Sequence, residues 1–174
     1  LTPDYFANEI EQHFKDSQVN VTIKNEDEIR EEGIGLLDAV GKGSINPPRL
    51  VVLEYKGSTQ DPIALVGKGV TYDSGGYQIK SKTGMPTMKY DMSGASNVVG
   101  MMHAINQLQL PIHVVAVLPL AENMISNNAM KPDDVYTALS GETVEITNTD
   151  AEGRLVLGDA VSFVKQYKPE LIMN

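Results

Sequence analysis

The sequence contains no cysteine and no tryptophan, and only 6 % of its 174 residues are aromatic. The lack of cysteine excludes a disulfide framework, a thiolate nucleophile and a thiolate zinc site, and it suits the cytoplasmic location that we expect. No stretch approaches the ~20 apolar residues of a membrane-spanning helix. The N-terminus also lacks a basic segment followed by an apolar one, which a signal peptide requires. We therefore expect no membrane partner.

Basic residues are few: 14 lysines and arginines stand against 23 acidic residues, a net charge of −9. A nucleic-acid partner is not expected for this segment, because phosphate backbones require a basic face. The acidic balance suits a site that concentrates carboxylates around cations. The hydrophobic content of 41 % and the length favour one folded domain with a buried core.

Apolar strands alternate with helical patterns along the chain, which predicts a layered α/β/α domain with a mixed central sheet. Thr2-Pro3-Asp4 is typical of a helix start, and Asn25 with Glu28 resembles a capping box. The polar segment 56–62 predicts a hairpin between its flanking strands, and the segment 121–134 predicts a loop. The expected strands cover residues 19–23, 50–55, 63–66, 113–118, 143–146 and 171 onward, and the longest expected helix runs from Ser93 until Pro111 ends it.

Two segments combine glycine with ionisable residues at the ends of apolar strands. Asp73 and Asp91 belong to the first segment and its continuation, and Asp150 and Glu152 belong to the second. Ligands of open α/β sheets bind beyond the carboxyl ends of the strands, so we expect these carboxylates to meet. Four carboxylates in one place stay ionised only if cations neutralise them, and hard divalent metals prefer oxygen ligands.

The spacing alone leaves several interpretations open. Asp150 and Glu152 would share one side of an extended segment, as a ligand pair requires, or would instead charge the first turn of a helix. Lys68 beside cations is either a neutral ligand or a charged group that stabilises an oxyanion, and the same holds for Lys80, unless Lys80 is simply a solvated surface residue. Metal identity and reaction type stay open at this point.

The segment Asn148–Leu155 resembles, without a substitution, the signature octapeptide of the leucine aminopeptidase (cytosol aminopeptidase) family. The segment 67–76, Lys80 and the segment 88–92 resemble the other metal-binding segment of that family, with matching gaps. Pro47-Pro48-Arg49 and Ala121-Glu122-Asn123 also fit its pattern. Asp133 departs from the pattern, because it stands where relatives usually carry glycine. The resemblance covers essentially the whole chain.

This resemblance implies a two-metal aminopeptidase that removes the N-terminal residue of peptides by attack of a metal-bridged hydroxide on the first peptide carbonyl. It implies zinc or manganese, with magnesium or cobalt as alternatives. Lys80 would be the electrophilic lysine, and Arg154 would hold a bicarbonate ion that acts as general base. The metal ligands that the resemblance implies are Lys68, Asp73, Asp91, Asp150 and Glu152.

By the same resemblance, residues 1–174 are the N-terminal part of the metallopeptidase catalytic domain, a truncated piece without the separate N-terminal domain and the remainder of the catalytic domain. The chain begins at Leu1 rather than methionine and ends at the start of a strand, which suits this expectation. The resemblance further implies peptides with a free N-terminus as partners and a homo-hexamer for the full-length protein. The alternatives are a two-metal phosphoesterase, an inactive fragment, and a DNA-binding or assembly role in the same family.

Overall fold

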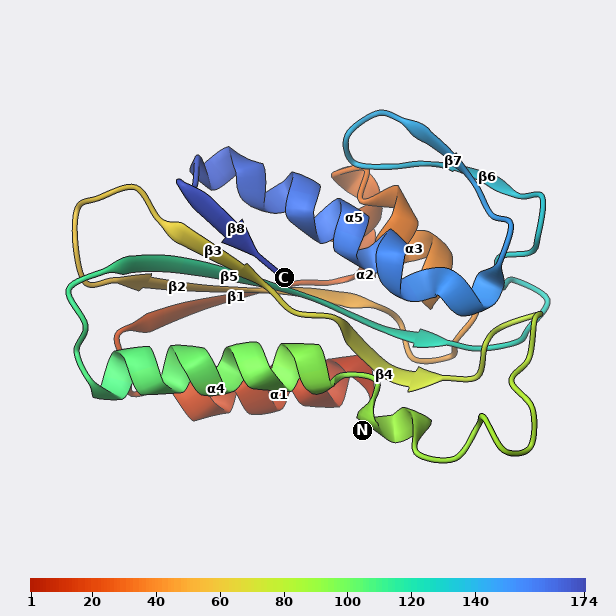
Figure 1. Cartoon of the computed structure of the whole chain (residues 1–174), viewed down its shortest axis with the longest axis horizontal. Coiled ribbons are helices and arrows are strands. Elements are labelled where there is room, and N and C mark those ends of the chain that lie inside the picture. The colour runs from red at the N-terminus through yellow and green to blue at the C-terminus, as the bar shows by residue number, and fades with distance from the viewer.

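The computed structural model describes residues 1–174 and places a mixed sheet between two layers of helices, which confirms the predicted α/β class (Figure 1). Helices α1, α2 and α3 precede most of the sheet, α4 lies mid-chain and α5 near the end. The helices are α1 (Pro3–Phe14), α2 (Glu26–Glu31), α3 (Gly35–Gly41), α4 (Ser93–Gln107) and α5 (Glu152–Val164). The strands are β1 (Val19–Lys24), β2 (Arg49–Lys56), β3 (Ile63–Val66), β4 (Gly69–Asp73), β5 (His113–Asn123), β6 (Val135–Thr137), β7 (Thr143–Glu145) and β8 (Leu171–Met173).

The central sheet has the strand order β1-β2-β5-β3-β8, and β4 also pairs with β5. Strand β5 is antiparallel to β2 and parallel to β3 and β4, so the sheet is mixed. The predicted hairpin between β2 and β3 is wrong. The two strands are not neighbours, because β5, which comes about 50 residues later in the chain, lies between them.

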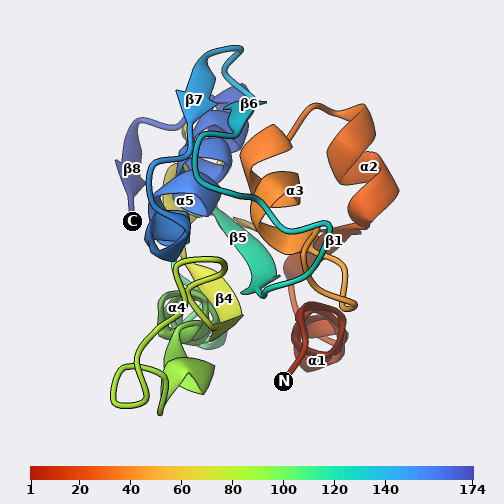
Figure 2. The same cartoon turned by 90° about the vertical axis from the view of Figure 1, so that its right-hand side faces the viewer.

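The two faces of the sheet carry separate apolar cores. Helices α1 and α4 cover one face, and α2, α3 and α5 cover the other (Figures 1 and 2). Helix α1 begins as predicted, with the Thr2 side chain accepting a hydrogen bond from the amide of Tyr5, and Asn25 and Glu28 form the predicted capping box. Both features satisfy amide groups that a helix start leaves unpaired.

Strands β3 and β4 follow one another along β5 with a break at Gly67 and Lys68. Residues 63–66 of β3 pair with residues 114–117 of β5, and β4 pairs with residues 120–123. The register shifts by one residue between Val70 and Tyr72. At the break, the carbonyl oxygen of Lys68 accepts a hydrogen bond from the amide of Ala95 in α4. Lys68 therefore leaves the ladder while its backbone stays anchored.

Three sequence expectations differ from the structure at element boundaries. The segment 143–146 was expected to lead from the sheet into the site, but β7 pairs only with β6, in a separate two-stranded sheet. Helix α4 ends at Gln107, before Pro111, because Gln109 takes a positive φ of 49°. Strand β5 extends to Asn123, so the predicted loop begins three residues later than expected. No helix has the length and apolar character needed to cross a membrane.

Asp133, the position that departs from the family pattern, has a φ of 71°. This left-handed conformation favours glycine, and aspartate tolerates it better than most other residues. The turn that leads into β6 therefore keeps a glycine-like backbone conformation although it carries a side chain.

Candidate functional site

The ligand candidates lie on four elements that meet beyond the ends of β4 and β5, at the end of the molecule that faces the viewer in Figure 2. Asp73 is the last residue of β4, and Asp91 follows a short 3-10 helix, η1 (Met88–Tyr90). Asp150 lies in a second 3-10 helix, η2 (Thr149–Ala151), and Glu152 is the first residue of α5. We call these four side chains the carboxylate cluster.

Two lysines cross-link the carboxylate cluster in pairs. The Nζ atom of Lys68 lies 2.7 Å from Asp91 Oδ2 and 2.9 Å from Glu152 Oε1. The Nζ atom of Lys80 lies 2.8 Å from Asp73 Oδ2 and 2.6 Å from Asp150 Oδ1. Four carboxylates thus share two ammonium groups. Negative charge remains in excess at the cluster, which is the electrostatic condition for binding additional cations.

Three members of the cluster are close enough to hold one ion together. One carboxylate oxygen each from Asp73, Asp91 and Glu152 lies within 4.8 Å of the other two. Asp73 and Glu152 are buried, with exposed fractions of 3 % and 1 %. The Oε2 atom of Glu152 is buried without a hydrogen-bond partner. An unpaired buried carboxylate oxygen is costly unless a cation satisfies it, so the residues fit a hard divalent metal.

The pKa values of two carboxylates and of both lysines at the cluster are shifted from their usual values. Burial raises the pKa of Glu152, and repulsion from Asp73 adds to this effect against the opposing pull of Lys68. Burial likewise raises the pKa of Asp91. Burial lowers the pKa of Lys68, but its contacts with Asp91 and Glu152 outweigh burial, and its pKa lies above the usual 10.5. The pKa of Lys80 is also raised, because Asp150 and Asp73 outweigh burial.

The backbone around Asp150 and Glu152 differs from the extended segment that the sequence suggested. Asp150 lies in η2 and Glu152 in the first turn of α5, so the predicted extended segment is wrong and the predicted helix start is confirmed. Glu152 charges the start of a helix, where a carboxylate is favourable. The turn still directs both carboxylates to the lysines named above.

Every side chain predicted for the site lines one cleft of about 560 Å³. This cleft includes Arg154, which is exposed and has no ion-pair partner. Its guanidinium is available to an anion, whereas Lys68 and Lys80 are occupied by the cluster. The main chain makes a tight turn directly after Asp73. Gly75 and Gly76 have φ values of 89° and 65°, a region that L side chains rarely adopt.

Sequence reasoning gave no role to the residues that hold Asp73 in place. Asn123 Nδ2 donates a 2.8 Å hydrogen bond to Asp73 Oδ1, and the Gly75 amide donates one of 2.9 Å to the same oxygen. Asn123 also contacts the carbonyl of Thr149. Asn123 belongs to a segment that fits the family pattern. That match to the family pattern is the only signal for Asn123 in the sequence.

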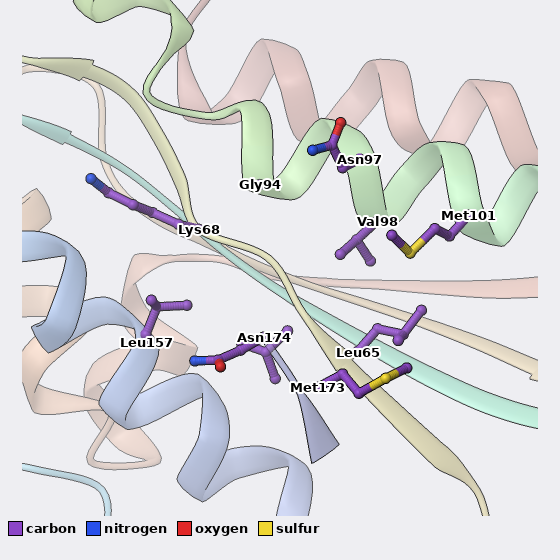
Figure 3. Close-up of a pocket in the computed structure, with 10 residues that line it drawn as sticks. Leu65, Lys68, Gly94, Asn97, Val98, Met101, Leu157, Met173 and Asn174 are labelled. Carbon is purple, nitrogen blue, oxygen red and sulfur yellow. The ribbon is translucent and has the colours of Figure 1, made fainter. Parts of the chain in front are cut away.

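A second pocket, of about 330 Å³, lies between α4, α5 and the edge of the sheet at β3 and β8 (Figure 3). Its lining is mainly apolar, with Leu65, Val98 and Met173 among the contributors. Lys68 stands at one end of this pocket and is the only member of the site in its lining. Lys68 and Leu157 line both this pocket and the cleft at the carboxylate cluster, so the two adjoin.

Comparison with known proteins decides the family. The model of the cytosol aminopeptidase family, catalytic domain, matches residues 1–174. This chain belongs to the cytosol aminopeptidase family. A probable cytosol aminopeptidase of Nitrosomonas europaea is 46 % identical over 175 residues, which cover 99 % of this chain and 35 % of the relative. One of Exiguobacterium sibiricum is 56 % identical over 143 residues, covering 82 % of this chain and 30 % of the relative.

Solved structures with similar sequences share the fold. The leucine aminopeptidase of Caenorhabditis elegans superposes with a TM-score of 0.94 at 44 % identity, covering 98 % of this chain and 35 % of that one. The bottromycin maturation enzyme BotP in complex with Mn gives a TM-score of 0.91 at 40 % identity, covering 98 % of this chain and 37 % of that one. The chain thus spans about a third of the length of the relatives it matches.

Proposed function

We propose that this chain provides the metal centre of a two-metal aminopeptidase that removes the N-terminal residue from peptides. Membership of the family supports a peptidase, and the observation that carries the metal assignment is the buried, unpaired Oε2 atom of Glu152 within the carboxylate cluster. Lys68, Asp73 and Asp91, with Asp150 and Glu152, would hold two divalent ions. Manganese or zinc is the first choice, and magnesium or cobalt the second; the manganese complex of BotP supports manganese.

Divalent ions bound in the cluster would supply Lewis acidity, the chemistry that activates water and polarises a peptide carbonyl near neutral pH. The chain itself supplies carboxylate oxygens from Asp73, Asp91 and Glu152 that already lie within 4.8 Å of one another, and Asp73 and Glu152 are buried. A preorganised site loses little free energy to rearrangement when the substrate arrives. Peptides with a free N-terminus are the proposed substrates.

Lys80 is proposed to stabilise the oxyanion that develops on the peptide carbonyl. Its ammonium group is shared between Asp73 and Asp150. Lys80 becomes available to a developing negative charge when those two carboxylates bind cations instead, because the attraction that holds the ammonium group is then reduced. Arg154, exposed in the same cleft, would hold a bicarbonate ion, which would supply a general base.

The remaining features belong to the whole protein, of which the matched region forms about a third in the relatives. We propose a homo-hexamer in the cytoplasm. The lack of cysteine and the names of the relatives support the cytoplasmic location. Nucleic acid is not a proposed partner of this segment, because its net charge is −9. A phosphoesterase is less well supported, because the matching family model and the relatives are named as aminopeptidases.

The proposal is tested by measuring bound metal and hydrolysis in the same preparations. Protein loaded with Mn²⁺ or Zn²⁺ should bind two ions per chain and hydrolyse aminoacyl anilides but not phosphate esters. Asp73→Ala should lose metal and turnover together, whereas Asp61→Ala, an exposed acidic residue in the β2–β3 connection, should change neither. Full metal content with phosphate-ester hydrolysis would reassign the reaction, and absence of bound metal in the wild type would remove the metal centre.

A further inference from the structure

We propose that Asn123 is a positioning residue whose single amide group sets the spacing between the Asp73 and Asp150 segments of the carboxylate cluster. The role in metal binding rests on the proposed function, but the geometry does not. Asn123 is the last residue of β5 and is buried, with an exposed fraction of 1 %. It lies where the two segments, far apart in sequence, come together.

The two amide hydrogens of Asn123 serve two different segments. Nδ2 donates to Asp73 Oδ1 at 2.8 Å and to the carbonyl oxygen of Thr149 at 2.9 Å. Thr149 directly precedes Asp150. An asparagine side chain has two N–H donors, so this arrangement uses its full donor capacity. No carboxylate could replace it here, because an ionised carboxylate only accepts hydrogen bonds.

The amide also selects which oxygen of Asp73 faces the cleft. Asp73 Oδ1 accepts from both Asn123 and the amide of Gly75, which leaves Oδ2 as the oxygen that contacts Lys80. A carboxylate held through one oxygen by two donors has a fixed orientation. Fixing the orientation of ligands in this way commonly changes metal affinity by about 10- to 100-fold.

The main chain of Asn123 anchors the same turn from its other side. Its carbonyl oxygen accepts hydrogen bonds from the Ser74 amide at 3.0 Å and from Ser74 Oγ at 2.7 Å. Thr149 Oγ1 in turn donates to the carbonyl of Gly75 at 2.7 Å and accepts from the amide of Gln78 at 2.9 Å. The turn after Asp73 and the turn before Asp150 are therefore joined by several bonds, and Asn123 is the one side chain among them that also contacts a member of the carboxylate cluster.

The experiment compares Asn123→Ala with the matched control Asn106→Ala. Asn106 is also a buried asparagine, in α4, but its amide oxygen accepts from the backbone of Gln18, away from the cluster. In Co²⁺-loaded protein, Asn123→Ala should alter the visible absorption spectrum and weaken metal affinity by about 10- to 100-fold. Asn106→Ala should alter neither, although both variants lower stability. Asn123→Asp keeps the side-chain volume while it removes both donors, and it should also alter the spectrum.

A readout without metal separates this proposal from the proposed function. Hydrogen exchange of the amides of Gly75, Gln78 and Thr149 in metal-free protein should accelerate in Asn123→Ala and stay unchanged in Asn106→Ala. Unchanged exchange in Asn123→Ala, or wild-type Co²⁺ spectra in both Asn123 variants, would overturn the positioning role. Failure of the wild type to bind metal, with accelerated exchange in Asn123→Ala, would instead overturn the proposed function and leave the joining of the two segments intact.

Discussion

The Nζ atom of Lys68 lies 2.9 Å from Glu152 Oε1, while the other oxygen of the same carboxylate, Oε2, is buried without a partner. The lysine therefore compensates only part of the charge at this position. It also occupies the place of a cation, because the pKa of Lys68 is raised above 10.5 and its amine carries a proton at neutral pH. An ammonium group has no lone pair for a metal, so ligation by Lys68 requires loss of that proton.

Metal binding is therefore expected to release a proton from Lys68. Affinity for Mn²⁺ should rise by about tenfold per pH unit from this proton alone, as long as the pH stays below the raised pKa. Calorimetric titration in buffers of different ionisation enthalpy counts the protons released. Wild type should release one more proton than Lys68→Met, and the exposed-residue variant Lys82→Met should match the wild type. Equal proton release in wild type and Lys68→Met would exclude Lys68 as a neutral ligand.

Replacement of Lys80 by alanine is expected to separate binding from turnover. The ammonium group of Lys80 competes with metal for Asp73 and Asp150, so Lys80→Ala should retain its metal content. Loss of an oxyanion donor should lower kcat by about 10²- to 10³-fold. Metal analysis with steady-state kinetics provides the measurement, and the exposed neighbour Lys82→Ala is the control. Unchanged kcat in Lys80→Ala would remove Lys80 from the mechanism.

Gly153→Ala is expected to disturb the site without weakening the fold. A Cβ atom at Gly153 would lie 2.9 Å from Cε and 3.0 Å from Nζ of Lys68, so the lysine must move. Alanine favours the helical conformation of α5, and stability should be unchanged or higher. Metal affinity should fall by about tenfold, within the range produced by changing residues that orient metal ligands. Gly158→Ala in the same helix meets only an ordinary 3.7 Å contact and is the control. Equal affinity in the two variants would contradict the expectation.

Asp159 is expected to stabilise the fold rather than serve the site. It is fully buried in α5, and its carboxylate accepts hydrogen bonds from the amides of Leu36, Leu37 and Leu139. Asp159→Ala leaves these amides unpaired and should lower the free energy of unfolding by about 3 kcal/mol. Urea denaturation gives the value. Asp159→Asn, which places an amide hydrogen against the donors, should also destabilise. A loss below about 0.5 kcal/mol, the range of ordinary surface substitutions, would contradict this role.

Asp134 is expected to make the stability depend on pH at the acidic end. The amide of Lys131 and the hydroxyl of Tyr136 donate to its carboxylate and lower its pKa from 3.8 to about 2. A lowered pKa contributes stability that is present above pH 3.8 and is lost as the pH falls through about 2. Because the group is near the surface, solvent screening limits this contribution to about 1 kcal/mol.

Carboxyl NMR titration of Asp134 measures this pKa directly. Asp134→Asn should be less stable than wild type near neutral pH, and the difference should shrink as the pH falls below 3.8. The exposed Asp133→Asn variant is the control and should show no such convergence, because no structural hydrogen bond depends on the Asp133 side chain. A measured pKa of about 3.8 for Asp134 would contradict the expectation.

Local patterns predicted most elements of the fold but not their pairing. Helix starts such as Thr2 and the Asn25–Glu28 capping box involve residues close in sequence, so their chemistry is visible in the sequence. Strand β2 pairs with β5, which lies more than 50 residues further along the chain. The polar turn between β2 and β3 carries no information about this pairing. Long-range order in a sheet depends on which faces bury apolar area together, and periodicity alone does not specify this.

The candidate site was predictable as a set of residues but not as a geometry. The strand-end and charge patterns predicted that Asp73, Asp91, Asp150 and Glu152 lie close together. In the structure, all four line one cleft. The pairing of each lysine with two carboxylates could not be read from spacing, because it depends on where the β3–β4 break places Lys68. Asn123 escaped notice because a hydrogen-bonding role leaves no periodic or charge pattern in a sequence.

The register shift in β4 decides on which side of the sheet Asp73 emerges. Lys68 and Asp73 are five residues apart, and in an uninterrupted strand this odd spacing would send their side chains to opposite faces. The extra residue between Val70 and Tyr72 converts the odd spacing into an even one relative to β5. Without this shift, Thr71 would pair with Glu122, and the Asp73 carboxylate would turn toward the α1 and α4 layer, away from the cleft that Lys68 lines.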